Sequence, residues 1–272
     1  MKKLIFVLSV LILTSLVLTA CGTKTTTTGG GTGTAGLPDL KGKTITVAVE
    51  NAYPPFNSID SATNKGVGWD YDTVTEICKR LNCVPEFKQA AWDGIFPAMQ
   101  AGEYDMLADG VTSYPYRFWA VDFSIPYSLV SQQLLVRAAD NHTVVDFKGD
   151  PNLKVGTQIG TTNYIAATQA FPDKTIQSYS DFGAATLALL AGDIDGVVLD
   201  DTAAFGFVQE NPGKLKTTGA VTTGDALAFV FPPYSDLENP VNAALRSMHA
   251  DGTLAIFNKR WGLSTPPEEP AQ

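Results

Sequence analysis

Residues 153–200 read LKVGTQIGTTNYIAATQAFPDKTIQSYSDFGAATLALLAGDIDGVVLD and alternate short apolar runs with segments of helical character. Three runs have the length and apolar content of buried strands: 153–158, 175–180 and 195–200. Two segments that read as helices separate them: 159–171 and 182–193. Repeated strand–helix–strand units of this kind predict a parallel sheet with helices on both of its faces.

An earlier stretch of the chain has the same pattern. Strands are expected at 44–50, 84–90 and 105–110, and helices at 71–82 and 92–104. In the first of these helices, Val74, Ile77, Cys78 and Leu81 fall on one face. The sequence therefore predicts two α/β lobes, whose ligands would gather at the carboxyl ends of the strands.

The rest of the chain supplies connecting and terminal elements. An extended apolar segment covers 131–139, a further strand is expected at 225–231, and 239–262 reads as two helices.

The N-terminal residues have the pattern of a secretion signal. Two lysines precede an apolar run from Leu4 to Ala20, and Cys21 follows in the stretch LTAC, which looks like a lipobox. We expect a lipoprotein signal peptide over 1–20 and a lipid on Cys21. An uncleaved membrane anchor is the alternative, although the run is at the short end of the roughly 17–25 residues that a spanning helix needs. The threonine- and glycine-rich stretch 21–42 can bury little apolar surface, which predicts a flexible tether.

The charge of the chain excludes some partners. The formal net charge is −9, and loss of residues 1–20 would remove two lysines and no acid, giving −11. Nucleic acids and anionic lipid surfaces bind basic clusters, so neither is expected as a partner.

Cysteine and histidine positions bear on crosslinks and metals. Cys78 and Cys83 lie five residues apart, which in an extracytoplasmic protein predicts a disulfide between a helix end and the next strand. Two buried free thiols are the alternative. The histidines, His142 and His249, are remote from these cysteines, so we expect no metal site and no cofactor.

Two stretches could bind an anion. In QIGTTNYIAA, glycine and two threonines precede a helix, where free backbone N–H groups meet the positive end of the helix dipole. An ordinary threonine N-cap is the alternative. In DGVTSYPYRFW, Arg117 offers a forked set of donors that fits a carboxylate, or else a surface salt bridge to Asp122.

Acids at strand ends could form a second part of a site. Asp200 and Asp201 end a strand and should face opposite ways, so at most one would line a cleft. An aspartate N-cap of a following helix is the alternative. Glu50 also ends a strand.

These stretches together resemble a known family. The order AYPPFN, GVGWDYDTVTEICKRL, AWDGIFPAMQAGEYDMLADGVT, Arg117, AVDFSIPY, VGTQIGTT and IDGVVLDD is similar to that of the polar amino acid solute-binding proteins of ABC importers, and it spans 43–262. The resemblance implies the periplasmic binding protein type II fold. Two crossing hinge strands near 131–137 and 221–228 would join lobe 1, made of 43–131 plus 228–262, to lobe 2, made of 137–221, and 263–272 would be a tail.

The resemblance also implies how one end of an amino acid is held. Arg117 corresponds to the arginine that grips the α-carboxylate, and Thr112 lies beside it. Thr161 and Thr162 correspond to the hydroxyl residues of lobe 2 that hold the same carboxylate. Closure of both lobes on the ligand would follow from these shared contacts.

The opposite end and the flanks of the ligand are implied in the same way. Asp200 corresponds to the acid that takes the α-ammonium group, together with the carbonyl of Gly110. Tyr53 and Trp92 correspond to the pair that sandwiches the ligand side chain.

The specificity implied by the resemblance rests on two acids. Glu50 matches a position where relatives that bind histidine, lysine, arginine or glutamine carry an acid, and Asp109 adds a second carboxylate. Two carboxylates between aromatic faces suit a cation, so arginine or lysine is favoured, with glutamine and histidine next. Tyr114 and Tyr116 stand where relatives have smaller or charged residues, and they either pack on the surface or crowd the cleft.

The function implied is capture of a free amino acid outside the cytoplasm by a lipid-anchored monomer, which passes it to the transmembrane subunits of an ABC permease. An enzyme similar to the cyclohexadienyl dehydratases, with Glu50 or Asp109 as general acid, is one alternative. A ligand-binding module of a sensor is the other.

Overall fold

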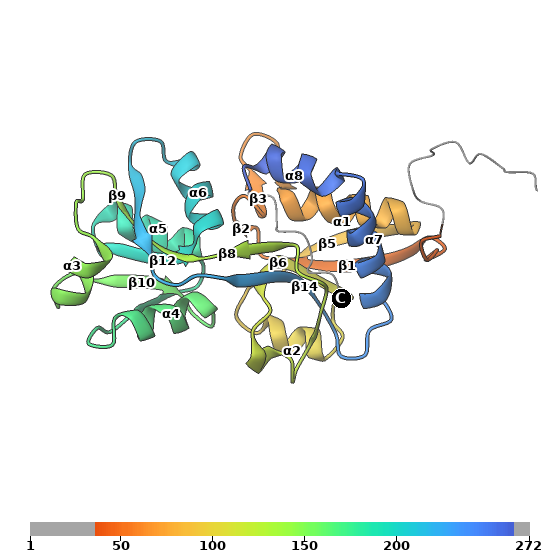
Figure 1. The fold of residues 1–272 in the computed structure, drawn as a ribbon, viewed down its shortest axis with the longest axis horizontal. Helices are drawn as coiled ribbons and strands as arrows, with labels where there is room; N and C mark the ends of the chain where they lie inside the picture. The colour runs from red at the N-terminus through yellow and green to blue at the C-terminus, as the bar shows by residue number, and fades with distance from the viewer. Residues whose placement is uncertain (1–35, 264–272) are drawn as a thin grey trace, which may run out of the picture. The chain divides into compact units, whose positions relative to one another are not determined.

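The computed structural model describes residues 36–263, and Figure 1 shows their two α/β lobes. Lobe 1 is built on a six-stranded sheet in the order β5-β1-β6-β14-β7, with β8 also paired to β14. Strands β1, β5 and β6 are parallel, whereas β14 is antiparallel to β6. The strands are β1 (Lys43–Val49), β5 (Cys83–Gln89), β6 (Met106–Thr112), β7 (Asp122–Phe123), β8 (Ser128–Val130) and β14 (Asp225–Phe231).

Helices cover both faces of this sheet. Helices α1 (Trp69–Leu81), α7 (Glu238–Ala250) and α8 (Thr253–Trp261) pack together on one face, and α2 (Ile95–Gln100) lies on the other (Figure 1). Alternation along β1 explains this, because Val47 belongs to the core beneath α1 while its neighbour Ala48 packs with the residues of α2. Helix α2 is much shorter than the predicted 92–104, since Gly94 precedes it in a left-handed conformation.

Lobe 2 repeats the plan with five strands in the order β11-β10-β12-β9-β13. Strands β10 to β12 are parallel, and β9 and β13 are antiparallel to their neighbours. The strands are β9 (Gln132–Arg137), β10 (Val155–Gln158), β11 (Gln177–Tyr179), β12 (Gly196–Asp200) and β13 (Leu215–Ala220). The helices are α3 (Val144–Gly149), α4 (Thr162–Ala170), α5 (Phe182–Ala191) and α6 (Asp201–Glu210).

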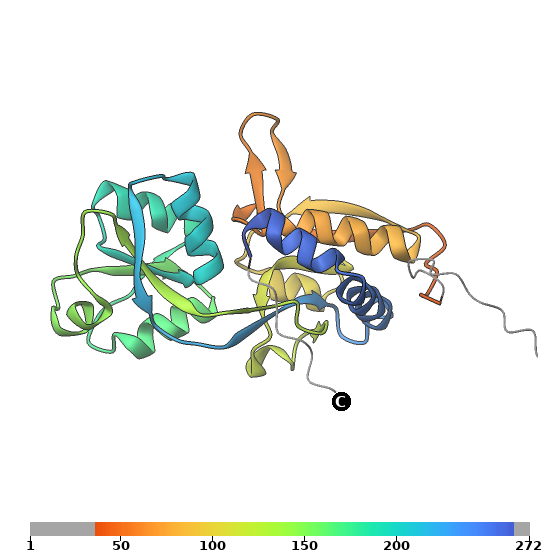
Figure 2. The same ribbon diagram turned by 45° about the horizontal axis from the view of Figure 1, so that its top comes forward.

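A small antiparallel sheet projects from lobe 1 and was not predicted. It consists of β2 (Ala52–Tyr53), β3 (Asn57–Asp60) and β4 (Lys65–Val67), seen in orange in Figure 2. Its strands of two to four residues are too short to show a strand period in the sequence.

The chain passes between the lobes twice, over segments shorter than the predicted hinge strands. It leaves lobe 1 between β8 and β9 and returns through residues 221–224. Strand β9 pairs along its length with β12, and β14 pairs with β6, so most of 131–137 and 225–228 belongs to the two sheets. The two passages touch where the amide of Val221 donates to the carbonyl of Gln132 at 2.7 Å.

The predicted tether ends earlier than residue 42. Leu37 and Leu40 pack against the core of lobe 1, and the amide of Leu40 donates to the carbonyl of Leu81 at 2.7 Å. The predicted signal peptide, Cys21 and the tail from residue 264 lie outside the described residues. Within 36–263, no helix has the length and apolar character that would let it cross a membrane.

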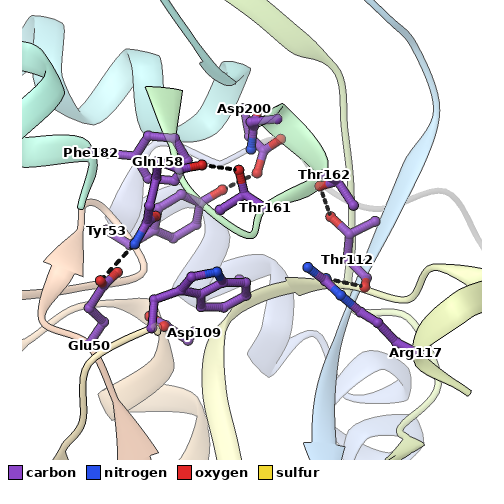
Figure 3. A pocket seen from close by; sticks show the side chains of 13 residues that line it. Glu50, Tyr53, Asp109, Thr112, Arg117, Gln158, Thr161, Thr162, Phe182 and Asp200 are labelled. Atoms are coloured by element: carbon purple, nitrogen blue, oxygen red, sulfur yellow. Dashed lines mark hydrogen bonds between the residues drawn. The ribbon is translucent and has the colours of Figure 1, made fainter. Parts of the chain in front are cut away.

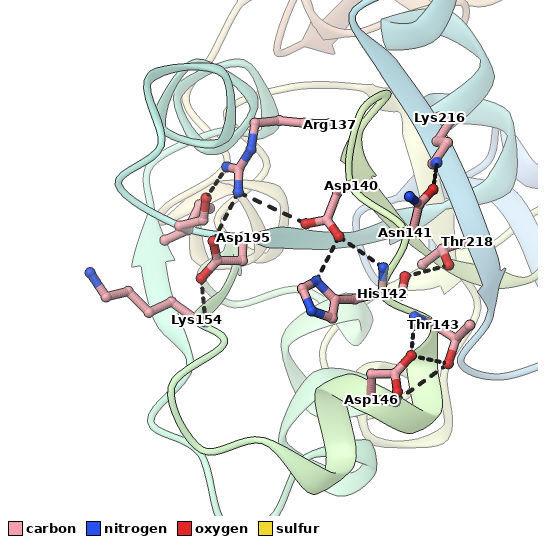
Figure 4. A network of polar contacts seen from close by, with 11 residues as sticks. Arg137, Asp140, Asn141, His142, Thr143, Asp146, Lys154, Asp195, Lys216 and Thr218 are labelled. Carbon is pink, nitrogen blue, oxygen red and sulfur yellow. Dashed lines mark hydrogen bonds and ion pairs between the residues drawn. The ribbon is translucent and has the colours of Figure 1, made fainter.

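Two further contacts brace the lobes. In lobe 1 a disulfide joins Cys78 at the end of α1 to Cys83 at the start of β5. In lobe 2, Arg137 on β9 donates to the carbonyls of Leu189 and Ile194 at 2.9 and 2.6 Å and pairs with Asp195 at 2.9 Å (Figure 4). Arg137 thereby ties the end of α5 to the strand that follows it.

Candidate functional site

A cleft lies between the lobes at the carboxyl ends of their parallel strands (Figure 3). This is where α/β sheets bind ligands, because helix N-termini and loops converge there. All ten predicted ligand residues line it: Glu50, Tyr53, Trp92, Asp109, Gly110, Thr112, Arg117, Thr161, Thr162 and Asp200. Gln158, Asn163 and Phe182 line it as well.

Side chains of the two lobes touch directly across the cleft. The hydroxyl of Tyr53 donates to a carboxylate oxygen of Asp200. The hydroxyls of Thr112 and Thr162 are 3.1 Å apart, and Gln158 Nε2 donates to Glu50 Oε1 at 2.7 Å. These three contacts bury the polar residues of the cleft, so a ligand could enter only if the lobes moved apart.

Arg117 is the buried cation of the cleft. It follows β6 in a 3₁₀ turn, and its side chain is buried, with 2% of the residue exposed. One nitrogen, Nη1, donates to the carbonyl of Thr112 at 2.8 Å, whereas Nε and Nη2 have no partner among the described residues. Burial lowers the pKa of Arg117, against the charge of Asp200 and a contact with Tyr116 that raise it. Buried donors without partners are costly, so this guanidinium is suited to an anion that would occupy them.

The start of α4 faces the same space from lobe 2. Thr161 is the N-cap: its hydroxyl accepts from the amide of Tyr164 at 3.1 Å and donates to the carbonyl of Gln158 at 2.8 Å. The Thr161 hydroxyl therefore acts as an ordinary helix N-cap, which was the alternative for this stretch. Thr162 points its hydroxyl at Thr112 instead (Figure 3). Free N–H groups and the dipole at this helix end favour an anion beside Arg117.

Asp200 is the acid of lobe 2 in the cleft. Its carboxylate accepts from Tyr53 and, at 2.8 Å, from Gln132, and it makes no side-chain cap to α6. Burial raises the pKa of Asp200 to about 6. Asp201 faces elsewhere, accepting from the hydroxyl of Ser131 at 2.9 Å, as strand alternation predicts. Asp200 can thus accept a cationic group with lone pairs that its present partners leave open.

Two more acids lie at the other end of the cleft. Burial raises the pKa of Glu50, and the charged neighbours that raise it further are Asp109 and Asp181. Burial also raises the pKa of Asp109. Beneath them, Asn57 Nδ2 donates at 2.8 Å both to Asp109 and to Asp70, whose pKa burial raises to about 8. This end of the cleft is therefore rich in carboxylates that burial keeps protonated at higher pH than usual.

Aromatic rings enclose the cleft. The ring of Tyr53 lies against Gly110, where a Cβ would come within 2.2 Å of it, and Gly110 also has φ of +54°. Only glycine fits at that position. The guanidinium carbon of Arg117 is 4.6 Å from the centroid of Phe96 and 5.4 Å from that of Trp92. Tyr116 is half exposed and its centroid is 5.5 Å from the same carbon, so it flanks the arginine rather than lining the cleft.

Sequence reasoning missed several polar residues of the cleft. Gln158 directly precedes the IGTT stretch, so its place at a strand end was a usable signal. Behind the lining, Gln132 and Asn57 bond to the cleft acids, and Asp70 bonds to Asn57; these three had no signal, because packing and not sequence spacing brings them there. In the part of the chain that the structure describes, no group of three or more His, Cys, Asp or Glu side chains is placed to hold a metal ion.

Residues 45–264 match the model of the bacterial extracellular solute-binding proteins, family 3. The chain belongs to this family.

Three relatives illustrate the likeness of this solute-binding protein. The putative ABC transporter arginine-binding protein 2 of Escherichia coli is 32% identical over 80% of this chain and 90% of its own length. The L-cystine-binding protein TcyA of Bacillus subtilis is 30% identical over 80% of each chain. The structure of ArtJ, the arginine-, lysine-, histidine-binding protein of Geobacillus stearothermophilus, superposes with a TM-score of 0.75 at 29% identity, covering 82% of this chain and 97% of ArtJ.

These findings confirm the predicted resemblance to the polar amino acid-binding proteins of ABC transporters and the two-lobe type II fold. By their names these relatives are amino acid-binding proteins and not enzymes, as expected, and that of Escherichia coli belongs to an ABC transporter.

Proposed function

We propose that this solute-binding protein captures a cationic L-amino acid, arginine or lysine before glutamine or histidine, and delivers it to an ABC permease. The observation that carries the proposal is the pair Glu50 and Asp109. Both carboxyl groups are buried, their pKa values are raised, and the charges that raise the pKa of Glu50 are those of other acids. A guanidinium or ammonium group placed between them would supply the missing counter-charge.

The backbone groups of an amino acid suit the remainder of the cleft. Arg117 has two nitrogens without partners for an α-carboxylate, and the N-terminal end of α4 faces the same space. Asp200, on the opposite lobe from Arg117, would take the α-ammonium group. Because the two charges of the zwitterion meet opposite lobes, binding would favour the state in which the lobes are closed.

The relatives support a cationic ligand without deciding it. The name of the relative from Escherichia coli specifies arginine and that from Geobacillus stearothermophilus gives arginine, lysine and histidine, whereas that from Bacillus subtilis specifies cystine. The acids of the cleft are the reason to place this chain with the former.

Calorimetric titration of the purified protein against the twenty amino acids and ornithine tests the proposal. We expect arginine or lysine to bind most tightly. The matched variant Glu50→Gln keeps the shape of the side chain and should weaken cationic ligands more than glutamine. A neutral or acidic amino acid that binds most tightly, or an unchanged ranking in Glu50→Gln, would contradict the assignment.

We also propose that a lipid on Cys21 holds the protein at the outer face of the cytoplasmic membrane or in the periplasm. The basic start, the apolar run and the LTAC stretch support this. In cells, Cys21→Ser should move the protein from the membrane fraction to the soluble extracytoplasmic fraction, whereas Cys78→Ser should leave it on the membrane. Membrane retention of Cys21→Ser would refute lipidation.

A further inference from the structure

Helix α6 of lobe 2 approaches the backbone of lobe 1 closely at one glycine. A Cβ built on Gly206 would lie 2.6 Å from the carbonyl oxygen of Pro54 and 2.7 Å from its carbonyl carbon. The three nearest atoms to that position all belong to Pro54. Since two of them are backbone atoms, a side chain at 206 could not be accommodated by a rotamer change. Figures 1 and 2 both place α6 beside the turn between β2 and β3 that holds Pro54.

This contact belongs to the closed arrangement of the lobes. Tyr53, the residue before Pro54, donates to Asp200, the residue before α6, so both contacts span the same seam. The cleft is buried behind that seam, and a ligand can reach it only if Tyr53 leaves Asp200. Gly206, which follows Asp200 on α6, must then leave Pro54 as well.

We propose that Gly206 is a positioning residue that sets the balance between open and closed lobes without touching the ligand. Its lack of a side chain lets α6 reach the Pro54 backbone, which brings Asp200 and the start of α4 over the ligand. A methyl group at 206 would hold the lobes apart by about the depth of the clash. The inference deepens the proposed function and rests on it, because closure matters here only if a ligand is clasped.

A methyl group at 206 should affect stability and ligand affinity in opposite directions, which distinguishes this role from a structural one. Alanine is a better helix former than glycine, so Gly206→Ala should stabilise α6 wherever the lobes are apart. The same methyl opposes the closed form, which the ligand requires. A ligand that needs a disfavoured state binds with an affinity reduced by the population of that state. The variant should therefore be at least as stable as wild type without ligand, yet bind more weakly.

The test uses the amino acid that the wild-type protein binds most tightly in the survey above, with L-arginine as the first probe. Affinity is measured by calorimetry and the melting temperature is measured without ligand, for wild type, Gly206→Ala and Gly149→Ala. Gly149 is the matched control, because it also belongs to a lobe 2 helix, as the last residue of α3, and a Cβ there meets nothing within 4 Å. Small-angle X-ray scattering with and without ligand reports whether the lobes close.

We expect Gly206→Ala to bind at least tenfold more weakly, which corresponds to about 1.4 kcal/mol, with an unchanged or raised ligand-free melting temperature and reduced compaction on binding. Gly149→Ala should bind like wild type. Binding by Gly206→Ala within twofold of wild type would overturn the proposal, and so would a lowered ligand-free melting temperature, which marks a merely structural glycine. If wild type binds no amino acid, the proposed function itself has failed, a result that differs from every outcome for the variant.

Discussion

At the scale of single residues, Arg137 on β9 and Arg117 in the turn after β6 differ in how completely their guanidinium groups are hydrogen-bonded. This difference distinguishes a structural arginine from one that binds a ligand. Arg137 donates to two carbonyls and an aspartate of its own lobe, so its guanidinium is satisfied where it stands. Arg117 is more deeply buried and satisfied at one nitrogen only. Burying a charged group whose hydrogen-bond donors lack partners costs free energy that folding alone does not offset. The buried Arg117 therefore indicates a ligand that accepts from those donors.

This contrast gives a paired prediction. Arg117→Met keeps the packing volume beside Phe96 and should weaken every amino acid ligand by about 2–5 kcal/mol, the usual cost of removing one partner from a buried charge pair. The ligand-free melting temperature should stay the same or rise, since unpartnered donors disappear. Arg137→Met should do the reverse, lowering the melting temperature while affinity stays within threefold. Calorimetry and thermal denaturation of both variants provide the check, and equal effects on both quantities would contradict the division of roles.

The same residues show what the sequence could reveal. Arg117, Asp200 and Glu50 stood out because each follows an apolar strand, and strand ends converge in this fold. The hydroxyl of Thr161 proved to be a helix cap, a role that the sequence had left open. Asn57, which links two buried acids, gave no signal, because its neighbours are defined by packing and not by spacing.

At the scale of elements, periodicity predicted helices α1, α4, α5, α7 and α8 and the central strands, but it missed α3, the ten-residue α6 and the short strands. Helix α1 buries Val74, Ile77, Cys78 and Leu81 on one face, as its pattern indicates. The sheet β2-β3-β4 and strand β13 were absent from the expectations, because strands of a few polar residues have no period to detect. That small sheet nevertheless matters for the site, since it carries Tyr53 and Pro54 toward α6.

The junction of α1 and β5 carries its own prediction. The disulfide of Cys78 with Cys83 bridges the left-handed turn at Asn82. Closing so short a loop in the unfolded chain should stabilise the protein by about 2 kcal/mol. Urea denaturation with and without reductant should show that loss, and ligand affinity should not change, because the junction is remote from the cleft residues. The double variant Cys78→Ala and Cys83→Ala should behave like the reduced protein and be insensitive to reductant. A stability that reductant leaves unaltered in the wild type would show that the crosslink does not form.

At the scale of the whole molecule, closure brings acids together as well as shielding them. Glu50, Asp109 and Asp200 are buried together in the cleft between the lobes, and the buried cation Arg117 lines the same cleft. Without ligand, burial favours the protonated forms of these acids and so raises their pKa values, and at Glu50 the charge of Asp109 adds to the effect. A cationic ligand reverses this preference, so the closed state should be favoured most when such a ligand is present.

Binding of a cationic ligand should be linked to the release of protons from the cleft acids. A bound cation favours ionised carboxylates and lowers the pKa values that burial had raised, so the complex holds fewer protons than the free protein. Arginine binding should therefore release protons, and its affinity should rise with pH from the ordinary carboxyl range, about pH 4, up to the raised pKa of the cleft acids. Ligand-free stability should fall over the same range, because the unfolded chain binds fewer protons there.

Calorimetry near pH 6.5 in two buffers of different ionisation enthalpy measures this release. Arginine should release more protons from the wild type than from Glu50→Gln, and more than glutamine releases from the wild type. Proton uptake, or the same value for the variant, would show that Glu50 does not meet the ligand's charge.

The route of the chain has a consequence for how this molecule is made. Strand β14 lies between β6 and β7 in the sheet of lobe 1, yet more than a hundred residues, including all of lobe 2, separate it from them along the chain. Lobe 2 is continuous from β9 to β13 and can form as soon as it has been synthesised or exported, whereas lobe 1 waits for the last strand and for the large loop entropy of its return. We therefore expect lobe 2, which is inserted into the chain of lobe 1, to fold first. Lobe 1 should complete its fold last, although its residues come first in the chain.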